Sequence, residues 1–291
     1  MDIIQLFMHL YMYELEIWLN NHCYDILNIS FQSDEANTDR PLKEYLKKTI
    51  ETECNKISFF SQIETIKFTD SHGNLQIYSI NDDIKQITID KVYLPEELTP
   101  NIKQTLQLRK RAVFTKPDLC LELNINGKPY FETVELKSTK SDAIPGSSIQ
   151  QITPEEWVIF IKHNYCLAEI TTGQYLNTIN TKLQFPDRSP RPQVSFNELQ
   201  KWNEQNRRYE SNSLKFFSTS DEQLKSELLT DWQTVLAKRW VKIVLDNKPK
   251  MQEPWFNNNL RKFVLEFLNE YEEMPSEMKT AYKEFLSKII I

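Results

Sequence analysis

Three charged residues around an Asn-Gly pair have the types and the spacing of a metal-binding site. Asn126-Gly127 separates two apolar runs, and this dipeptide is the strongest short-range signal for a β-hairpin with a two-residue turn. In a hairpin with that turn, the pairing runs outward from Ile125 and Lys128, one residue at a time on each strand. Asp118 therefore lies directly opposite Glu135. Side chains alternate between the faces of a strand, which places Lys137 on the face that Asp118 and Glu135 share. The sequence therefore predicts two carboxylates and one ammonium group on one patch of sheet.

The two carboxylates of this patch predict a bound cation. Asp118 and Glu135 repel each other when they lie side by side, and an uncompensated pair destabilises the fold. A divalent cation removes that repulsion, and hard oxygen ligands of this kind suit Mg²⁺. The competing interpretation is an ordinary structural pair between Glu135 and Lys137, and the position of Asp118 argues against it.

The motif formed by these residues resembles that of a known enzyme family. Pro117-Asp118 followed by Glu135-x-Lys137 resembles the PD-(D/E)xK nuclease superfamily, whose core carries these residues on a hairpin of this kind. The stretches 135–140 and 144–151 are similar to those of type II restriction endonucleases. The resemblance covers roughly residues 110–185.

The resemblance implies a role for each residue of the motif. Asp118 and Glu135 are the implied metal ligands, and the backbone carbonyl of Leu136 is the implied third ligand of Mg²⁺. Lys137 is the implied group that orients or deprotonates the attacking water and stabilises the charge that builds up on phosphorus. A metal ion held in this way can activate water, neutralise a phosphate and stabilise the leaving oxygen.

A further acid, Glu53, is a possible additional metal ligand. A helix is expected from Pro41 to about Cys54, and Glu53 falls on its apolar face at a helical period. In the superfamily, a helix before the catalytic hairpin often supplies such an acid. The alternative is that the helix ends before Glu53, which then faces water.

Sequence-specific cleavage of DNA also requires residues that read base edges. Lys116 closes the most basic window of the chain, residues 99–116, and directly precedes the motif. The remaining candidates lie in polar segments: Ser138, Lys140, Ser148, Gln150, Gln151, Arg188 and Arg191. Each of them can instead be a helix cap, a phosphate contact or a solvated side chain. Arg207-Arg208 is interpreted as a neutralised surface pair on a helix.

Composition excludes several other classes of protein. The chain of 291 residues has a net charge of −6 and only four glycines, and it contains no GxGxxG, GxxxxGK[ST], HExxH or GxSxG motif. A Rossmann enzyme and an ATP-driven motor are therefore not expected. Four widely spaced cysteines predict reduced thiols and a cytoplasmic location. The apolar N-terminal segment is interrupted by charges, so neither a signal peptide nor a membrane span is expected.

The pattern of the chain predicts an α/β fold with a mixed central β-sheet flanked by helices, a restriction-endonuclease-like core, and a helical C-terminal region. Residues 1–56 form the expected helical N-terminal part, 57–185 the catalytic α/β core, and 186–291 a mainly helical region. The run from Trp157 to Ile161 is typical of a strand that is buried on both faces.

The function expected from the sequence is that of a site-specific endonuclease of the restriction type, which cuts double-stranded DNA with Mg²⁺. Palindromic targets imply a homodimer, and a DNA methyltransferase is the expected functional partner. One alternative is a repair, recombination or mobile-element nuclease that recognises DNA structure. The other is a module that binds DNA or protein without catalysis.

Overall fold

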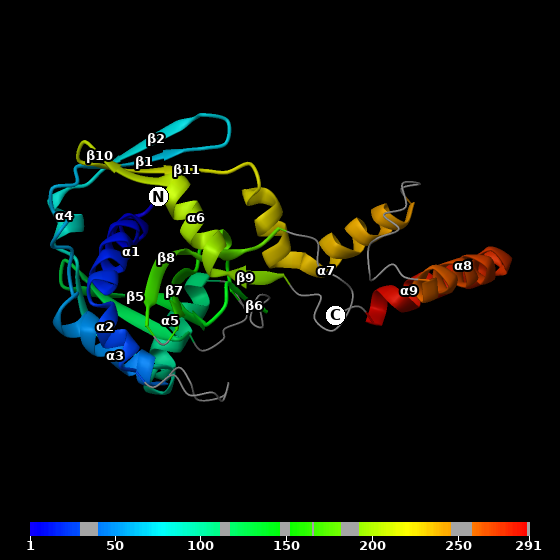
Figure 1. Ribbon diagram of the computed structural model, residues 1–291, viewed down its shortest axis with the longest axis horizontal. Coiled ribbons are helices and arrows are strands. Elements are labelled where there is room, and N and C mark those ends of the chain that lie inside the picture. The colour runs from blue at the N-terminus through cyan, green and yellow to red at the C-terminus, as the bar shows by residue number, and fades with distance from the viewer. Residues whose placement is uncertain are drawn as a thin grey trace. The chain divides into compact units, whose positions relative to one another are not determined.

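A mixed five-stranded sheet lies at the centre of the fold (Figure 1), as the sequence predicts. The structure is a computed structural model that describes residues 1–29, 40–110, 117–145, 152–164, 166–181, 192–245 and 258–289. In spatial order the strands are β3 (Thr88–Tyr93), β4 (Leu119–Ile125), β5 (Lys128–Thr139), β7 (Trp157–His163) and β8 (Ala168–Gln174). β5 and β7 are parallel, and the other neighbours are antiparallel.

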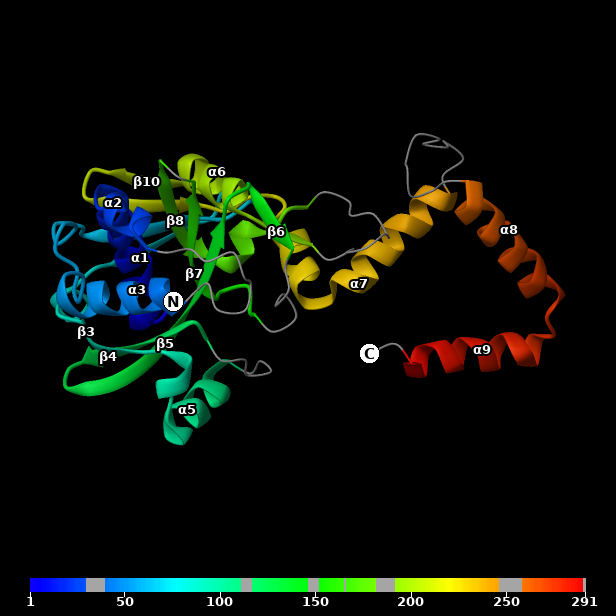
Figure 2. The ribbon, with the colours of Figure 1, turned by 60° about the horizontal axis from the view of Figure 1, so that its bottom comes forward.

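Helices cover both faces of this sheet. Val134, Leu136 and Ile159 pack with α1 (Ile3–Asn21) on one face. On the other face, Cys120 packs against α5 (Pro100–Lys110), and Phe160 contacts Phe196 at the start of α6 (Phe196–Asn206). Figure 2 shows α5 on the side of the β4–β5 hairpin that faces away from α1. The other helical elements of this region are α2 (Cys23–Leu27), α3 (Arg40–Thr52), α4 (Asp82–Lys85) and two 3₁₀ turns, η1 (Pro95–Glu97) and η3 (Tyr175–Thr178).

A second sheet brings distant segments of the chain together. Its spatial order is β10 (Arg207–Glu210), β11 (Ser213–Phe217), β1 (Thr65–Thr69) and β2 (Leu75–Ser79). The prediction that Arg207-Arg208 lies on a helix is wrong at this point, because α6 ends at Asn206 and β10 follows. β11 pairs in parallel with β1, and such a long-range pairing leaves no local signal in the sequence. A small two-stranded sheet joins β6 (Ala143–Pro145) and β9 (Gln193–Ser195).

Helix α1 lies between the two sheets and is buried on most of its surface. The ring of His9 contacts Phe68 and Phe216 of the second sheet and Trp157 of the first. A helix that is apolar nearly all round is typical of the interior of a protein, which is why α1 carries more than the single buried stripe of a surface helix.

Contacts between residues divide the chain into two compact units. Residues 1–182 and 191–235 form the first unit, and 183–190 with 236–291 form the second. The expected boundary at residue 186 therefore differs from the observed division, because α6, β9, β10 and β11 belong with the core. α7 (Glu222–Leu245) crosses the division, and Asp231 within it has a non-helical conformation.

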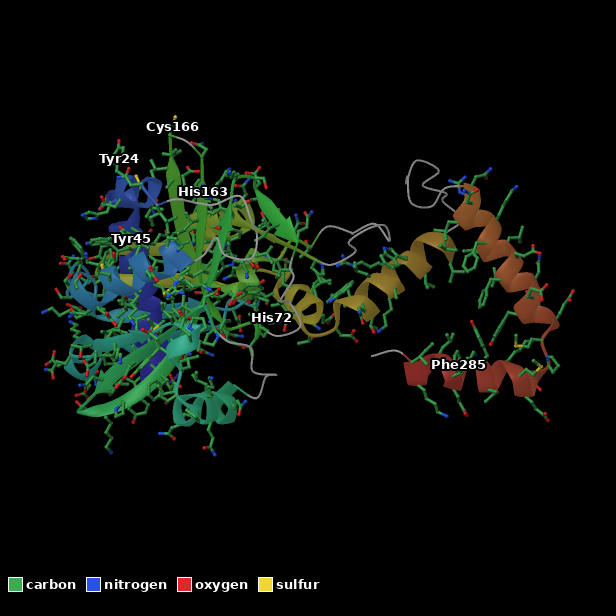
Figure 3. All side chains as sticks on the ribbon, turned by 90° about the horizontal axis from the view of Figure 1, so that it is seen from below. Tyr24, Tyr45, His72, His163, Cys166 and Phe285 are labelled. Atoms are coloured by element: carbon green, nitrogen blue, oxygen red, sulfur yellow. The ribbon has the colours of Figure 1, made fainter. Side chains whose placement is uncertain are left out.

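The second unit contains α8 (Asn258–Glu273) and α9 (Ser276–Ile289). Neither helix has a buried residue, and side chains such as Phe285 project from the ribbon (Figure 3). Within the described ranges, no helix combines the length and the apolar character needed to cross a lipid bilayer.

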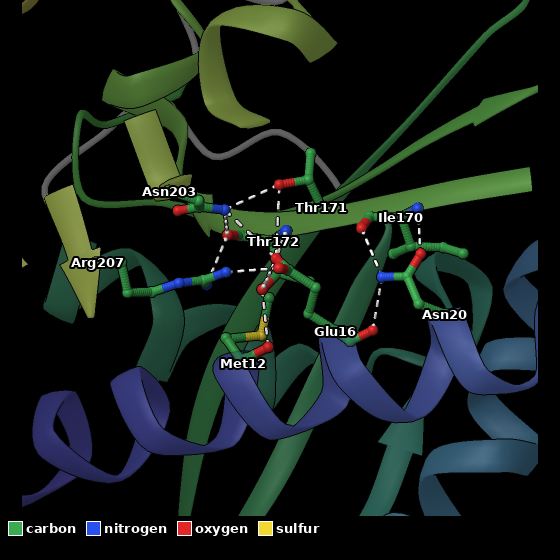
Figure 4. A network of polar contacts seen from close by, with 8 residues as sticks. All are labelled: Met12, Glu16, Asn20, Ile170, Thr171, Thr172, Asn203 and Arg207. Carbon is green, nitrogen blue, oxygen red and sulfur yellow. Dashed lines mark hydrogen bonds and ion pairs between the residues drawn. The ribbon is translucent and has the colours of Figure 1, made fainter. Parts of the chain in front are cut away.

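Side chains cover the outer edge of β8, the last strand of the central sheet (Figure 4). Asn20 bonds both backbone groups of Ile170, and Glu16 accepts the N–H of Thr172 at 2.6 Å. Asn203 donates to the Thr172 carbonyl at 2.9 Å. An uncovered edge strand is a template for unwanted pairing, and these bonds occupy it.

Arg207 completes the cover of this edge. It pairs with Glu16 at 2.5 Å, and its side chain is only 6% exposed. The interpretation of Arg207 as part of a surface pair on a helix is therefore wrong: it lies on β10 and its partner comes from α1.

Candidate active site

The predicted hairpin is confirmed with its register. Ile125 pairs with Lys128, and Leu119 pairs with Val134 at the far end of β4. Asn126 and Gly127 have φ of 51° and 77°, the left-handed values that a type I′ turn requires at both central positions. Asn and Gly tolerate these values best, so the local sequence fixes the register of the whole hairpin.

A hydrogen bond to its side chain holds Asp118 in position at the start of β4. Asp118 follows directly after Pro117, and its Oδ2 accepts the N–H of Leu136 at 2.9 Å. Continued by one pair beyond Asp118, the register of the ladder places Pro117 opposite Leu136. Proline has no N–H, so it cannot donate to the Leu136 carbonyl. The N–H and the C=O of a strand residue point to the same side of the strand. The Leu136 carbonyl therefore points toward β4, the side on which Asp118 lies.

Glu135 and Lys137 lie on the same face of β5 and contact each other. Lys137 Nζ donates to Glu135 Oε1 at 2.5 Å, and both side chains are mostly buried. Burial raises the pKa of the Glu135 carboxyl to about 7; the negative charge of Asp118 adds to this rise, and Lys137 opposes it. Continued by one pair, the register of the ladder sets Asp118 opposite Glu135, so alternation places both acids on one face of the sheet.

Sequence reasoning missed three residues around these carboxylates. Lys43 of α3 places its Nζ 2.6 Å from Asp118 Oδ1. Tyr175 is fully buried; burial raises the pKa of its hydroxyl, and both Glu135 and Asp118 raise it further. The negative charge of Glu156 contributes to the raised pKa of Glu135. All three come from segments outside the hairpin, so only tertiary structure brings them to the site.

The donor set of the site fits a hard divalent cation. Oxygens of Asp118, of Glu135 and of the Leu136 backbone are the ligand types that Mg²⁺ prefers, and Mg²⁺ usually keeps several waters besides. In the described part of the chain, no three His, Cys, Asp or Glu side chains gather into a metal site. A cation here would therefore rely on two side chains, one carbonyl and water.

Glu53 lies away from this site. α3 ends at Thr52, and Glu53 is exposed beyond it, which is the alternative that the sequence left open. It lines a different cavity together with Glu14, Cys54 and Ser58. The expected role of Glu53 as an additional metal ligand gains no support from this position.

Only two of the candidate DNA-binding residues belong to the described part of the chain. Ser138 lies on β5, and because side chains alternate along a strand, it is on the opposite face of the sheet from Glu135. Lys140 is exposed and follows directly after β5. The positive charge of Lys140 lowers the pKa of His163, after the larger effect of burial. The other candidates fall outside the described residues: Lys116, Ser148, Gln150, Gln151, Arg188 and Arg191.

Comparison with known proteins gives no match. No family model, no curated protein and no solved structure matches this chain.

Proposed function

We propose that this chain is a Mg²⁺-dependent endonuclease that cuts double-stranded DNA at a defined sequence, as type II restriction enzymes do. The observation that carries the proposal is the hairpin register, which sets Asp118 opposite Glu135 and leaves the Leu136 carbonyl beside Asp118. Lys137, bonded to Glu135, completes the PD-(D/E)xK pattern. The resemblance of the sequence to that superfamily supports the same conclusion.

The residues of the site supply distinct parts of phosphodiester hydrolysis. Mg²⁺, when bound, supplies a Lewis acid for the phosphate and lowers the pKa of a bound water. Asp118 and Glu135 would hold this ion, and the hydrogen bond from the Leu136 N–H keeps Asp118 in place. Lys137 orients the attacking water and stabilises the negative charge on the phosphate oxygens. The water oxygen forms a bond to phosphorus, the bond from phosphorus to one bridging oxygen breaks, and that oxygen leaves with a proton.

The approach of DNA is proposed to follow α5. This helix packs on the face of the sheet that carries Cys120. Because side chains alternate along a strand, Asp118 and the rest of the site lie on that same face. α5 contains the first part of the basic window of residues 99–116, and positive charges in such a window attract a phosphate backbone. A two-fold palindromic target requires a homodimer, and host DNA would require protection by a methyltransferase.

Cleavage of unmethylated DNA tests the proposal. The purified protein is incubated with plasmid and phage DNA in Mg²⁺ or in EDTA, and the products are separated on a gel. Discrete bands that require Mg²⁺ are expected. Glu135→Gln and Lys137→Ala are expected to abolish them, because each removes one member of the site.

Matched substitutions on the same hairpin serve as controls. Glu122→Gln changes an acid of β4 that bonds the Tyr93 hydroxyl, and Lys128→Ala changes an exposed lysine beside the turn. Both variants should cut like the wild type. A smear or structure-dependent nicking would favour the repair-type nuclease. Absence of cleavage, with both site variants indistinguishable from the wild type in DNA binding, would favour the non-catalytic module.

A further inference from the structure

Lys43 contacts the carboxylate that the proposed cation needs. It lies in the first turn of α3, and its Nζ is 2.6 Å from Asp118 Oδ1. The side chains of Lys43 and Asp118 are 18% and 17% exposed, so the pair is mostly shielded from water. An ion pair in this environment is screened less than one at the surface.

The two oxygens of Asp118 have separate partners. Oδ2 accepts the Leu136 N–H, and Oδ1 forms an ion pair with Lys43. A cation that binds at Oδ1 would lie close to the Lys43 ammonium, and two positive charges at such a distance repel each other. Lys43 and a divalent cation therefore compete for the same carboxylate oxygen.

We propose that Lys43 is a displaceable occupant of the metal site, which gives way to the divalent cation and then binds a phosphate oxygen of the DNA. This inference rests on the proposed nuclease function. The flexible four-carbon stem of lysine allows the ammonium group to change partner while its backbone stays in α3.

Charge balance supports a phosphate as the second partner. Lys43 and Lys137 each pair with one carboxylate of the site. A divalent cation on Asp118 and Glu135 adds two positive charges, and an anion is then the favourable neighbour for the released ammonium. A phosphodiester carries one negative charge, and the transition state of its hydrolysis carries more.

Cation binding in the absence of DNA tests the competition directly. Ca²⁺ alone and Mg²⁺ alone are titrated into the wild type and into Lys43→Met by calorimetry. The variant is expected to bind each ion about tenfold more tightly, the order of effect of removing one close unit charge. Lys43→Arg keeps the charge and should bind the ions like the wild type. Thermal melts establish that each variant is folded.

Lys47→Met is the matched control. Lys47 lies one turn further along α3 and pairs with Glu97 at 2.6 Å, with a side chain that is 21% exposed. Its removal takes the same charge from the same helix without touching Asp118, so cation affinity should stay within about twofold of the wild type. Equal cation affinity of Lys43→Met and the wild type, or no cation binding by any variant, would overturn the inference.

Cleavage provides the second readout. At saturating Mg²⁺, Lys43→Met is expected to cut DNA at least about tenfold more slowly than Lys47→Met, because a phosphate contact is lost. Equal cleavage by the two variants would refute the phosphate contact. If the wild type does not cut DNA at all, the proposed function is refuted. The titrations still test the competition between Lys43 and the cation, because they do not depend on cleavage.

Discussion

Asp118 Oδ2 accepts the backbone N–H of Leu136 at 2.9 Å, so a side chain takes the place of strand backbone where β4 begins. Pro117, opposite Leu136 when the register is continued, cannot donate to the Leu136 carbonyl in return. The Pro-Asp dipeptide therefore has a physical role: Asp118 accepts one half of the ladder pair, and Pro117 supplies no donor for the other half. A backbone carbonyl beside two carboxylates is suited to a cation.

Asp118→Asn is expected to separate structure from function. Asparagine keeps an oxygen that accepts the Leu136 N–H, but it loses the negative charge. The variant should lose cation binding and cleavage, and in metal-free buffer it should lose only the stability contributed by the Lys43 ion pair, about 1 kcal/mol. Asp118→Ala removes the acceptor of the Leu136 N–H as well and should lose about 1 kcal/mol more. Chemical denaturation and calorimetry check the two effects, and a metal-binding Asn variant would contradict the assignment of Asp118.

Local chemistry explains why the hairpin could be predicted from the sequence. Asn126 and Gly127 occupy left-handed conformations that few other residues tolerate, and one turn fixes every pair of the ladder. Lys43 and Tyr175 carry no comparable signal, because a lysine on a helix and a tyrosine after a strand are common features. The fold places them beside Asp118 and Glu135 through contacts between distant segments.

Cation binding should depend on pH through Glu135. Burial raises the pKa of this carboxyl to about 7, so below that pH a proton competes with the cation. The affinity for Ca²⁺ is expected to fall by about tenfold for each pH unit below pH 7. Titrations at several pH values measure the slope. Glu122→Gln should keep it, and a wild-type affinity that is constant from pH 5 to pH 8 would contradict the role of Glu135.

The same carboxyl affects stability in metal-free buffer with a definite sign. Its pKa is about 7 in the folded protein, against an ordinary glutamate pKa of 4.5. Between these values the unfolded chain releases the proton first, so the contribution of Glu135 lowers the free energy of unfolding as the pH rises. Glu135→Gln should therefore gain stability relative to the wild type on going from pH 4.5 to pH 8.

Parallel pairing is the part of the fold that the sequence left unpredicted. β11 and β1 are far apart in the chain, and each is too short to show more than a brief apolar run. Arg207 was misread for the same reason, because its partner Glu16 lies on the first helix. Periodicity identifies elements one at a time, whereas their pairing depends on contacts that only the folded chain makes.

Arg207→Met is expected to destabilise the core of the first unit. The pair with Glu16 is mostly buried, and the substitution leaves the carboxylate without its charged partner. The free energy of unfolding should fall by about 3 kcal/mol. Lys215→Met, which breaks the more exposed pair with Glu210 on the neighbouring strand, should cost less than about 1 kcal/mol. Urea denaturation compares the two, and equal losses would show that Arg207 has no special role.

His9 should make the protein sensitive to acid. Burial lowers its pKa to about 3 from 6.5, and the charge of Arg207 adds to this shift. The unfolded chain binds the proton first as the pH falls, so stability is lost progressively from pH 6.5 down toward pH 3 at about 1.4 kcal/mol per unit. His9→Phe should remove that slope. Phe68→Leu, which alters a neighbouring ring without a titrating group, should lower stability and keep the slope.

The C-terminal helices carry the spacing of a helix–helix seam. Leu260, Val264, Phe267 and Tyr271 of α8 follow one another at intervals of four, three and four residues. Met278, Tyr282, Phe285 and Ile289 of α9 repeat the same intervals. This spacing is typical of helices that pack along a common stripe. Phe267 is 42% exposed and Phe285 is 54% exposed, and we predict that these two positions contact a second copy of the chain.

Phe267→Glu combined with Phe285→Glu is therefore expected to separate a homodimer into single chains. Light scattering after size exclusion should give the wild type twice the chain mass of 34.7 kDa and the double variant the mass of one chain. Leu265→Glu is the matched control, because Leu265 is 60% exposed but lies off the stripe, and this variant should stay dimeric. A wild type that runs as a single chain at micromolar concentration would refute both the seam and the expected two-fold enzyme. A double variant that remains dimeric would place the contact between copies elsewhere on the chain.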